Sequence, residues 1–424
     1  MLSRTILTLL IAALAVHAQA PPVAPPGLPP VTPPGAPPAT PPVATPPVAT
    51  PPAATPPVAT PPVTPPVAAP VAPVAPPAAP AWPTQVGGKD LAAWLKEFTD
   101  SKDGSVREMA VKVIPMFGPT ARAPALKPLI RRLGDETDPG VRANIILALG
   151  AIGSEKPEEA KQICEALHGI LLKAGLGSPV RLHASRALAH YGPAAALAIP
   201  TFKNVAEDPA WETRQAVAQT LGRIGRATDP KKGPNSQAMN ILIDRLMREE
   251  SAVVRLEIAQ SLLMLGPPAY RPDVQGDYEK VIKPFLDVIA KKLESETDDA
   301  TRVWLLMVNM AYDGRAFNDT TITRIADYLN KPDVYAKYAA LRALGLLGDK
   351  AKAAVNAMIG VLRSEDNSLV AEAIAALAAM KTLAKDALPE LERIKAGTND
   401  YLKTMATEAI DIISGKKNPA VMPK

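Results

Sequence analysis

The sequence has little of what usually marks an enzyme or a disulfide-stabilised secreted domain. Cys164 is the single cysteine among 424 residues, so no disulfide can form within the chain and its stability must come from packing. Only four residues are histidine and 4% are aromatic. The sequence contains neither a Gly-rich phosphate loop nor a Gly-x-Ser-x-Gly motif. These absences favour a binding or structural role over catalysis, and no cofactor is predicted.

The chain also lacks a concentrated charge of one sign. Its 47 basic and 42 acidic residues give a formal net charge of +5, which is small for this length. Lysine and arginine are interspersed with aspartate and glutamate, whereas nucleic-acid-binding proteins usually carry a basic stripe. We therefore expect no nucleic-acid partner.

No apolar run is long enough to suggest a membrane-spanning helix. Residues 1–20 contain Arg4, an apolar run from Ile6 to Val16 and small residues up to Ala20. This run is shorter than the roughly 20 residues that span a bilayer, and the pattern is typical of a secretory signal peptide. The sequence predicts an exported chain, periplasmic or cell-envelope-bound or secreted, without membrane insertion of the mature form. An uncleaved anchor is the alternative.

Residues 21–88 contain no charged residue, and 28 of the 48 prolines lie between Pro21 and Pro83. Proline fixes its own backbone angle and biases the preceding residue towards extended conformations. The segment is therefore predicted to be a disordered or polyproline II linker. Alternatives are a ligand for a polyproline-binding domain or an O-glycosylated stalk. Residues 416–424 are predicted to be a disordered tail.

The rest of the chain repeats the pattern of Val141–Gly153. In this stretch the apolar residues fall at helical spacing on one face, and glycine ends the helix. We call Arg142 the anchor of its repeat. Equivalent positions recur every 33 to 47 residues at Arg107, Arg142, Arg181, Arg214, Arg255, Arg302, Lys337, Val370 and Lys403. A second helix precedes each copy, so residues 89–415 are predicted to form an all-α, right-handed α-solenoid of about nine stacked helix pairs.

The ends of these helices are marked in the sequence. Glycine follows the anchor by eleven or twelve residues in eight copies, at Gly118, Gly153, Gly192, Gly225, Gly266, Gly314, Gly348 and Gly415. Helix starts are indicated at Asp138-Pro139, Ser178-Pro179, Asp208-Pro209 and Pro332-Asp333. Residues 226–235 and 267–277 interrupt the period and are predicted to be inserted loops on one rim of the solenoid.

These repeats resemble the HEAT repeat family, particularly the short HEAT-like units of phycobilisome lyases. The likeness is carried by the Asp-Pro-x-Val-Arg start at Asp138 and by the turns Gly118-Pro119 and Gly192-Pro193. The resemblance implies an armadillo-like superhelix and a family of scaffolds, adaptors and a few enzymes. It also implies that the anchor arginines pair with acids, Arg142 with Asp138 and Arg214 with Asp208.

The clearest candidates for a metal site lie in the third repeat, at Cys164, His168, His183 and His190. Cys164 and His168 are four residues apart, which places them on one helix face. Cys164 also follows the core spacing, and no supporting carboxylate is evident, so a packed helix pair is the alternative. In HEAT-repeat di-iron enzymes the ligands come as His-Glu pairs. Here the three histidines precede Gly169, Ala184 and Tyr191, which does not match.

Positions two, five and nine residues after each anchor point away from the apolar stripe, so stacking should align them on a concave face. We call them the face positions. In the first two repeats they are Met109, Lys112, Met116, Asn144, Leu147 and Ala151. Candidate partner contacts are His183, Arg186, His190, Gln219, Arg223, Glu257, Gln260, Met264, Trp304, Met307 and Arg342. The alternatives are that Trp304 packs between helices and that the basic residues form an ordinary solvated face.

Together these features predict an exported, non-enzymatic scaffold that binds a protein or peptide on the concave face of a HEAT solenoid. A metal-dependent or lyase-type enzyme of the same fold is one alternative. A structural envelope tether, in which the linker matters and the concave face does not, is another. The oligomeric state and the identity of the partner are not encoded in any recognisable motif.

Overall fold

The computed structural model describes residues 82–173, 175–229, 232–269 and 276–416. The predicted signal peptide and the predicted linker up to residue 81 lie outside the described residues, as does the predicted tail beyond residue 416. Residues 230–231 and 270–275, within the two predicted insertions, also lie outside them. The described chain begins at Trp82, before the expected start at Lys89, and the ring of Trp82 lies against the backbone of Gly118.

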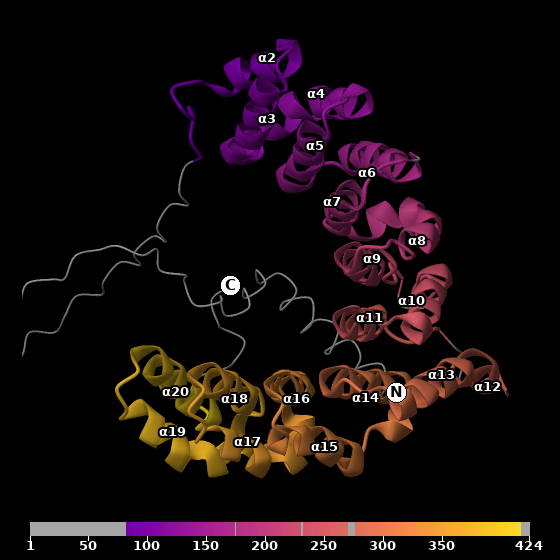
Figure 1. Cartoon of the computed structure of the whole chain (residues 1–424). Coiled ribbons are helices and arrows are strands. Elements are labelled where there is room, and N and C mark those ends of the chain that lie inside the picture. The colour runs from indigo at the N-terminus through magenta and orange to yellow at the C-terminus, as the bar shows by residue number, and fades with distance from the viewer. Residues whose placement is uncertain (1–81, 174, 230–231, 270–275, 417–424) are drawn as a thin grey trace, which may run out of the picture. The chain divides into compact units, whose positions relative to one another are not determined.

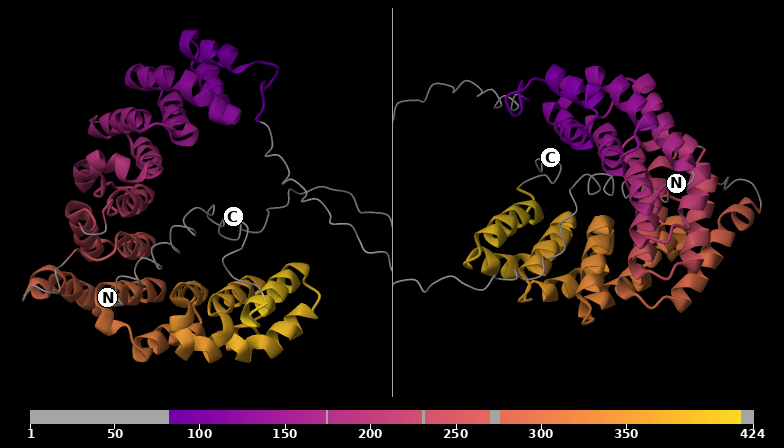
Figure 2. Two further views of the ribbon diagram at one scale, coloured as in Figure 1. Left: turned by 180° about the vertical axis from the view of Figure 1, so that it is seen from behind. Right: turned by 45° about the horizontal axis from the view of Figure 1, so that its top comes forward.

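The described residues form nine helix pairs arranged in two rows (Figures 1 and 2). The first-helix row consists of α2 (Leu91–Asp100), α4 (Arg122–Asp135), α6 (Pro157–Leu172), α8 (Ile199–Val205), α10 (Ser236–Arg248), α13 (Lys283–Ser295), α15 (Asp319–Ala326), α17 (Val355–Val361) and α19 (Leu388–Lys395). The second-helix row consists of α3 (Gly104–Val113), α5 (Pro139–Ile152), α7 (Ser178–Ala189), α9 (Trp211–Ile224), α11 (Ala252–Leu265), α14 (Asp299–Tyr312), α16 (Val334–Leu347), α18 (Asn367–Ala379) and α20 (Asp400–Ile413). The predicted all-α solenoid is confirmed.

Shorter elements connect these pairs. A short helix, α12 (Asp277–Val281), precedes α13. Six 3-10 segments lie between the longer helices: η1 (Ile114–Ala121), η2 (Gly192–Ala198), η3 (Gly314–Ala316), η4 (Asp327–Asn330), η5 (Gly348–Ala354) and η6 (Lys381–Ala387). None of the described helices is both long and apolar enough to cross a bilayer.

The apolar stripe of the repeat forms the core. In α5 the residues at helical spacing are all buried: Val141, Ile145, Ala148, Leu149 and Ile152. Each helix of the second row contacts the next one, from α3 through to α20 (Figure 1). The buried side chains therefore join into one cluster that runs from Trp94 to Ile413. This continuity is expected because a single helix pair cannot cover its own apolar face.

The glycines that follow the second helices serve one of two purposes. Gly153 ends α5 with φ of +64°, a left-handed conformation that side chains disfavour, as the repeat pattern predicted. Gly225 instead has φ of −84°, so the prediction of a left-handed stop is wrong there. A Cβ at Gly225 would lie 2.7 Å from Cβ of Ala238. Glycine is needed at this position because α10 passes close to the end of α9.

The predicted helix starts are only partly correct. The side chain of Asp138 caps α5 by accepting hydrogen bonds from the amides of Gly140 and Val141, at 2.8 and 3.0 Å. Asp333 similarly accepts from the amide of Tyr335 at 2.9 Å. At α7 no side chain caps the helix, which begins at Ser178 itself. At α9 the helix begins at Trp211, after Asp208-Pro209, because Asp208 has a different role in the stacking of repeats.

Four of the anchor arginines link their repeat to the next through ion pairs with buried carboxylates. Arg107 donates to both carboxylate oxygens of Glu136 at 2.9 and 2.8 Å. Arg214 contacts Glu249 in the same way at 2.8 Å for both bonds, and Arg255 contacts Glu296 at 2.7 Å for both. Arg181 pairs with Asp208. The carboxylate always comes from the position six residues before the next anchor, and we call this series the arginine ladder.

The ladder corrects the pairing that the family resemblance implied. The side chain of Arg142 donates to the backbone carbonyl of Glu136, not to the carboxylate of Asp138, which is occupied in capping α5. Arg214 likewise donates to the backbone carbonyl of Asp208, at 2.9 Å, while the Asp208 carboxylate pairs with Arg181. An acid of the same repeat is too close to its own anchor helix, so the pair forms with the neighbouring repeat.

Each ladder carboxylate is also tied to the backbone of its own repeat. One oxygen of Glu136 accepts hydrogen bonds from the amides of Thr137 and Asp138, both at 3.0 Å. Burial raises the pKa of Glu136, but the hydrogen bonds from Arg107 and from the Asp138 amide outweigh it and lower the pKa to about 2. The pKa of Glu249 is lowered to about 2 in the same way by Arg214 and Arg245.

The ladder has one internal gap and one end. The residue six before Arg181 is Gly175, so Arg142 has no carboxylate to face, and its Nε is buried without a hydrogen-bond partner among the described residues. The residue six before Lys337 is Lys331, so the sequence offers Arg302 no carboxylate at the ladder position, and Lys331 instead pairs with Asp299 at 3.7 Å. Beyond α14, the anchors are Lys337, Val370 and Lys403, and no buried arginine pair joins the described repeats there. Apolar packing holds these helices together, supplemented by partly exposed ion pairs of Arg342 with Glu372 and of Arg363 with Glu390.

Small residues let consecutive second helices approach each other closely. A Cβ added to Gly222 of α9 would lie 2.8 Å from Cβ of Ser261 and 3.0 Å from its Cα, in α11. A Cβ added to Gly150 would lie 3.3 Å from the nearest atom of Ala187 in α7. A Cβ added to Gly345 would lie 3.3 Å from the nearest atom of Ala376 in α18. These contacts fix the spacing of the second-helix row at three of its junctions.

The arginine ladder predicts acid sensitivity. A carboxylate with a depressed pKa contributes stability that is complete above its unfolded pKa near 4.5 and is lost as the pH falls towards about 2. For Glu136 and Glu249 the loss is about 3 kcal/mol each. We expect the urea midpoint, followed by helical circular dichroism, to fall progressively below pH 4.5. Glu249→Gln should lower the midpoint at pH 7 and reduce its pH dependence. Glu155→Gln, which removes an exposed carboxylate, should change neither.

The close approach at Gly222 predicts that even one methyl group is costly. Gly222→Ala should destabilise the protein by about 1–3 kcal/mol, because the Ser261 backbone cannot move away without displacing α11. The matched control is Gly169→Ala in α6, where nothing lies within 4 Å of the added carbon. That change should stabilise by roughly 0.5–1 kcal/mol through helix propensity. Equal effects on the urea midpoint would contradict the packing argument.

Candidate functional site

The face positions of the first two repeats form an exposed apolar patch. Met109 and Met116 are 57% and 52% exposed, and Leu147 is 44% exposed. Met109 lies in α3, Met116 follows it in η1 and Leu147 lies in α5, which contacts α3. The sequence placed these residues on the face but did not single them out as partner contacts. The missed signal was that long apolar side chains occupy face positions in two consecutive repeats.

The next repeat presents basic and imidazole groups. Arg186 of α7 is exposed and His183 of the same helix is half-buried, and the exposed His190 follows the last residue of α7. Burial lowers the pKa of His183, and the nearby positive charge of Arg186 lowers it further. Burial also lowers the pKa of His190, with a further contribution from Arg223. Nδ1 of His183 is buried without a hydrogen-bond partner in the described part of the chain. The structure thus groups these predicted residues on one side of α7.

The fourth and fifth repeats add polar side chains that are only partly accessible. Gln219 and Arg223 of α9, and Glu257 and Gln260 of α11, are all half-buried. Burial raises the pKa of Glu257 to about 7, although Arg223 and a hydrogen bond from Gln215 act in the opposite direction.

Three predicted contact residues are not accessible. Trp304 and Met307 of α14 are 3% and 1% exposed and belong to the continuous core, and Met264 of α11 is 8% exposed. Bulky apolar side chains at these face positions fold onto the neighbouring helices instead of facing solvent. We therefore leave them out of the candidate surface. Arg342 of α16 is exposed, but its guanidinium pairs with Glu372 of α18 at 3.3 Å.

The metal candidates separate into two groups. Cys164 and His168 lie on α6 in the first-helix row, where Cys164 is buried and a ring nitrogen of His168 lies 2.8 Å from the hydroxyl of Thr201. Burial raises the pKa of the Cys164 thiol to about 11. His183 lies on α7 and His190 at its C-terminal end, in the other row. Nowhere in the described chain do three His, Cys, Asp or Glu side chains gather in a way that could hold a metal ion.

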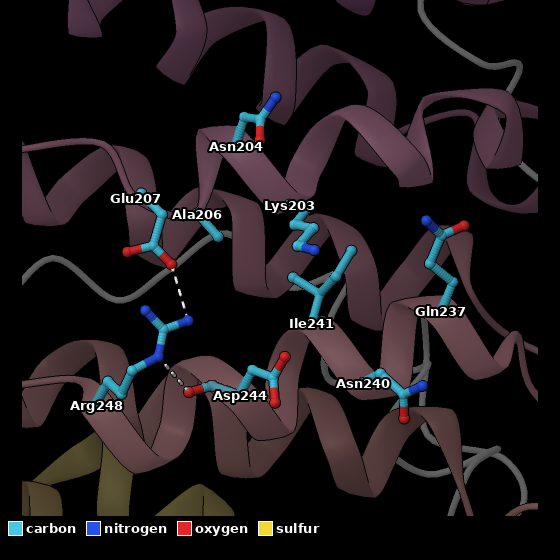
Figure 3. A pocket seen from close by; sticks show the side chains of 9 residues that line it. All are labelled: Lys203, Asn204, Ala206, Glu207, Gln237, Asn240, Ile241, Asp244 and Arg248. Atoms are coloured by element: carbon cyan, nitrogen blue, oxygen red, sulfur yellow. Dashed lines mark hydrogen bonds and ion pairs between the residues drawn. The ribbon is translucent and has the colours of Figure 1, made fainter.

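A separate polar groove lies in the first-helix row, between α8 and α10 (Figure 3). Its volume is about 550 Å³, and its lining residues are Lys203, Asn204, Ala206, Glu207, Gln237, Asn240, Ile241, Asp244 and Arg248. Glu207 pairs across the groove with Arg248 at 3.0 Å and with Arg245 at 2.8 Å. Because its central charges already neutralise each other, the groove has less to offer a charged ligand than the face of α7.

Comparisons with solved structures find other helical assemblies. An engineered protein is 21% identical, with 77% of this chain and 89% of that chain covered and a TM-score of 0.43. A karyopherin, Kap121p, bound to the extreme C-terminus of the phosphatase Cdc14p, is 14% identical with a TM-score of 0.39. The match covers 78% of this chain and 38% of the karyopherin. A homology model of the AP-3 complex in an intermediate open conformation is 11% identical, with 75% and 54% covered and a TM-score of 0.48.

The chain thus spans well under two thirds of the karyopherin and AP-3 chains that it matches. No curated protein sequence matches it. The family model for HEAT repeats matches three segments, residues 91–169, 171–263 and 322–411, which together make up more than half of the chain. These segments include all or most of eight of the nine second helices, with their anchors, and the pair α13 and α14 lies between the second and third segments. The chain therefore belongs to the HEAT repeat family.

Proposed function

We propose that this protein is an exported scaffold that binds a protein or peptide along its second-helix row. HEAT solenoids are built for extended binding surfaces, because their stacked repeats present successive helices side by side. The proposal includes the prediction that this row is the concave side of the solenoid. Export and the role of the Pro-rich segment as a spacer are part of the proposal and rest on residues 1–20 and 21–88 of the sequence.

The observation that carries the proposal is the exposed series Met109, Leu147 and Arg186 on consecutive second helices. The core beneath them is complete without them, since Val111, Ile145 and Leu188 are fully buried in the same three helices. Side chains that contribute little to packing, and that are long, apolar or basic, are the kinds that interfaces use.

Replacing this series should remove partner binding without unfolding the chain. We expect the triple variant Met109→Ser, Leu147→Ser, Arg186→Ser to recover at least ~10-fold less cross-linked partner from the native host. A matched triple variant, Arg131→Ser, Leu172→Ser, Met247→Ser, changes the same residue types at exposed positions of the first-helix row. It should bind like the original chain. Equal recovery from both variants, with unchanged helical content, would assign binding to another surface.

The exported state has its own test. The chain expressed with residues 1–20 should be recovered outside the cytoplasm with a new N-terminus after Ala18 or Ala20, as read by N-terminal sequencing. A chain without residues 1–20 should stay inside. A recovered chain that still begins at Met1 would support the uncleaved anchor instead. Deleting residues 21–83 should leave binding intact. If it abolished envelope retention while the serine variants had no effect, the tether alternative would be favoured.

A further inference from the structure

The apolar patch and the basic groups of α7 form one continuous strip of two chemically different halves. Met109, Met116 and Leu147 make up the apolar half, from α3, η1 and α5. Arg186 of α7 and Arg223 of α9 make up the basic half, and the imidazole of His190, at the C-terminal end of α7, adjoins them. In Figure 1 the helices α3, α5, α7 and α9 follow each other directly along the second-helix row.

Specific contacts join neighbouring helices along this strip. The amide nitrogen of Asn144 in α5 lies 3.3 Å from a carboxylate oxygen of Glu108 in α3. The ring of His190, at the C-terminal end of α7, lies against Gly150 in α5, 3.7 Å from where a Cβ would be. Gly150 is one turn from Leu147, so the basic half begins where the apolar half ends. A ligand that covers Leu147 therefore also reaches His190.

The apolar half is suited to side chains of varied shape. Methionine is unbranched and polarisable, so exposed methionines adapt to different apolar partners. Lys112 is the basic neighbour at the remaining face position of α3, and Glu108 neutralises it at 2.6 Å. This half of the strip consequently offers apolar contact with little net charge.

The basic half favours negative charge. Arg186 is exposed and forms no ion pair with another described residue. A guanidinium in this state can donate two parallel hydrogen bonds to a carboxylate. Arg223 lies close enough to Glu257 of α11 to lower the pKa of that carboxyl group, against the larger effect of burial. An incoming carboxylate therefore meets, at Arg186, a guanidinium that is exposed and forms no ion pair among the described residues.

The spacing of the helices sets the length of the ligand. Packed helices lie about 8–10 Å apart, so the strip from α3 to α9 measures about 27 Å. An extended peptide covers that distance with about eight residues. Resting on the proposed function, we propose that the second-helix row recognises a short extended partner segment in which apolar side chains adjoin acidic ones.

A selection from random peptides tests this specificity without knowledge of the natural partner. The probe is a library of random 12-residue peptides displayed on phage and selected on the full-length chain. We expect enrichment of peptides that carry leucine, isoleucine, phenylalanine or methionine next to aspartate or glutamate. Selection on Arg186→Ser should lose the acidic preference, and selection on Met109→Ser, Leu147→Ser should lose the apolar one.

The best peptide then gives a quantitative measurement. Arg186→Ser should weaken its binding, followed by fluorescence anisotropy, about 10-fold or more, because a charge-assisted hydrogen bond is lost. Raising the salt concentration should weaken binding to the original chain more than to the variant. The Arg131→Ser control, on α4, should bind like the original chain, and circular dichroism confirms that each variant is folded.

Three results would overturn the inference: enrichment of basic or neutral peptides, equal binding of the selected peptides by the strip variants, or no enrichment at all. None of them affects the proposed function, which is judged separately by cross-linking of the natural partner to the triple variant. If cross-linking depends on the strip while the selection fails, the row is an interaction surface with a different chemistry.

Discussion

The buried pairing of an anchor arginine with a carboxylate of the next repeat is the constraint on which four of the five junctions between the first six repeats depend. Three of the pairs carry two direct hydrogen bonds and the Arg181–Asp208 pair carries one, and in each the same carboxylate accepts from backbone amides near the start of the next second helix. A buried charge that loses its partner is strongly destabilising, whereas the pair as a whole contributes little beyond an apolar equivalent. The ladder therefore specifies the register of stacking more than it adds stability, and apolar packing supplies most of the stability.

The fold could be predicted from the sequence because its signals are local and repeated. The spacing of Val141, Ile145 and Leu149 decides which side of one helix is buried, and nine copies decide the architecture. The partner of each arginine could not be predicted in this way. The choice between Asp208 and Glu249 for Arg214 depends on how two repeats stack, and both acids lie at plausible distances along the chain.

The sequence predicted on which side of the helices the candidate surface lies, but not which residues of that side are exposed. Helical periodicity places Leu147, Arg186 and Trp304 on the same side of their helices. It does not predict how deeply each of these side chains is buried. Depth is set by the side chain itself and by the neighbouring helix, so Trp304 turns inward and becomes core while Leu147 stays exposed. The folded structure, and not the periodicity, separates the exposed apolar side chains of the face positions from the buried ones.

The head-to-tail geometry of the ladder has a consequence for how such a chain can change in length. Repeats four and five each carry one acid, Asp208 or Glu249, and one arginine, Arg214 or Arg255. Duplicating or deleting either whole repeat would still leave every buried carboxylate opposite a guanidinium. A duplication or deletion that begins inside a repeat could leave a buried carboxylate or a guanidinium without its partner. Recombination between gene segments is thus tolerated at whole-repeat boundaries, and the reach of the binding row becomes a property that evolution can adjust in single units.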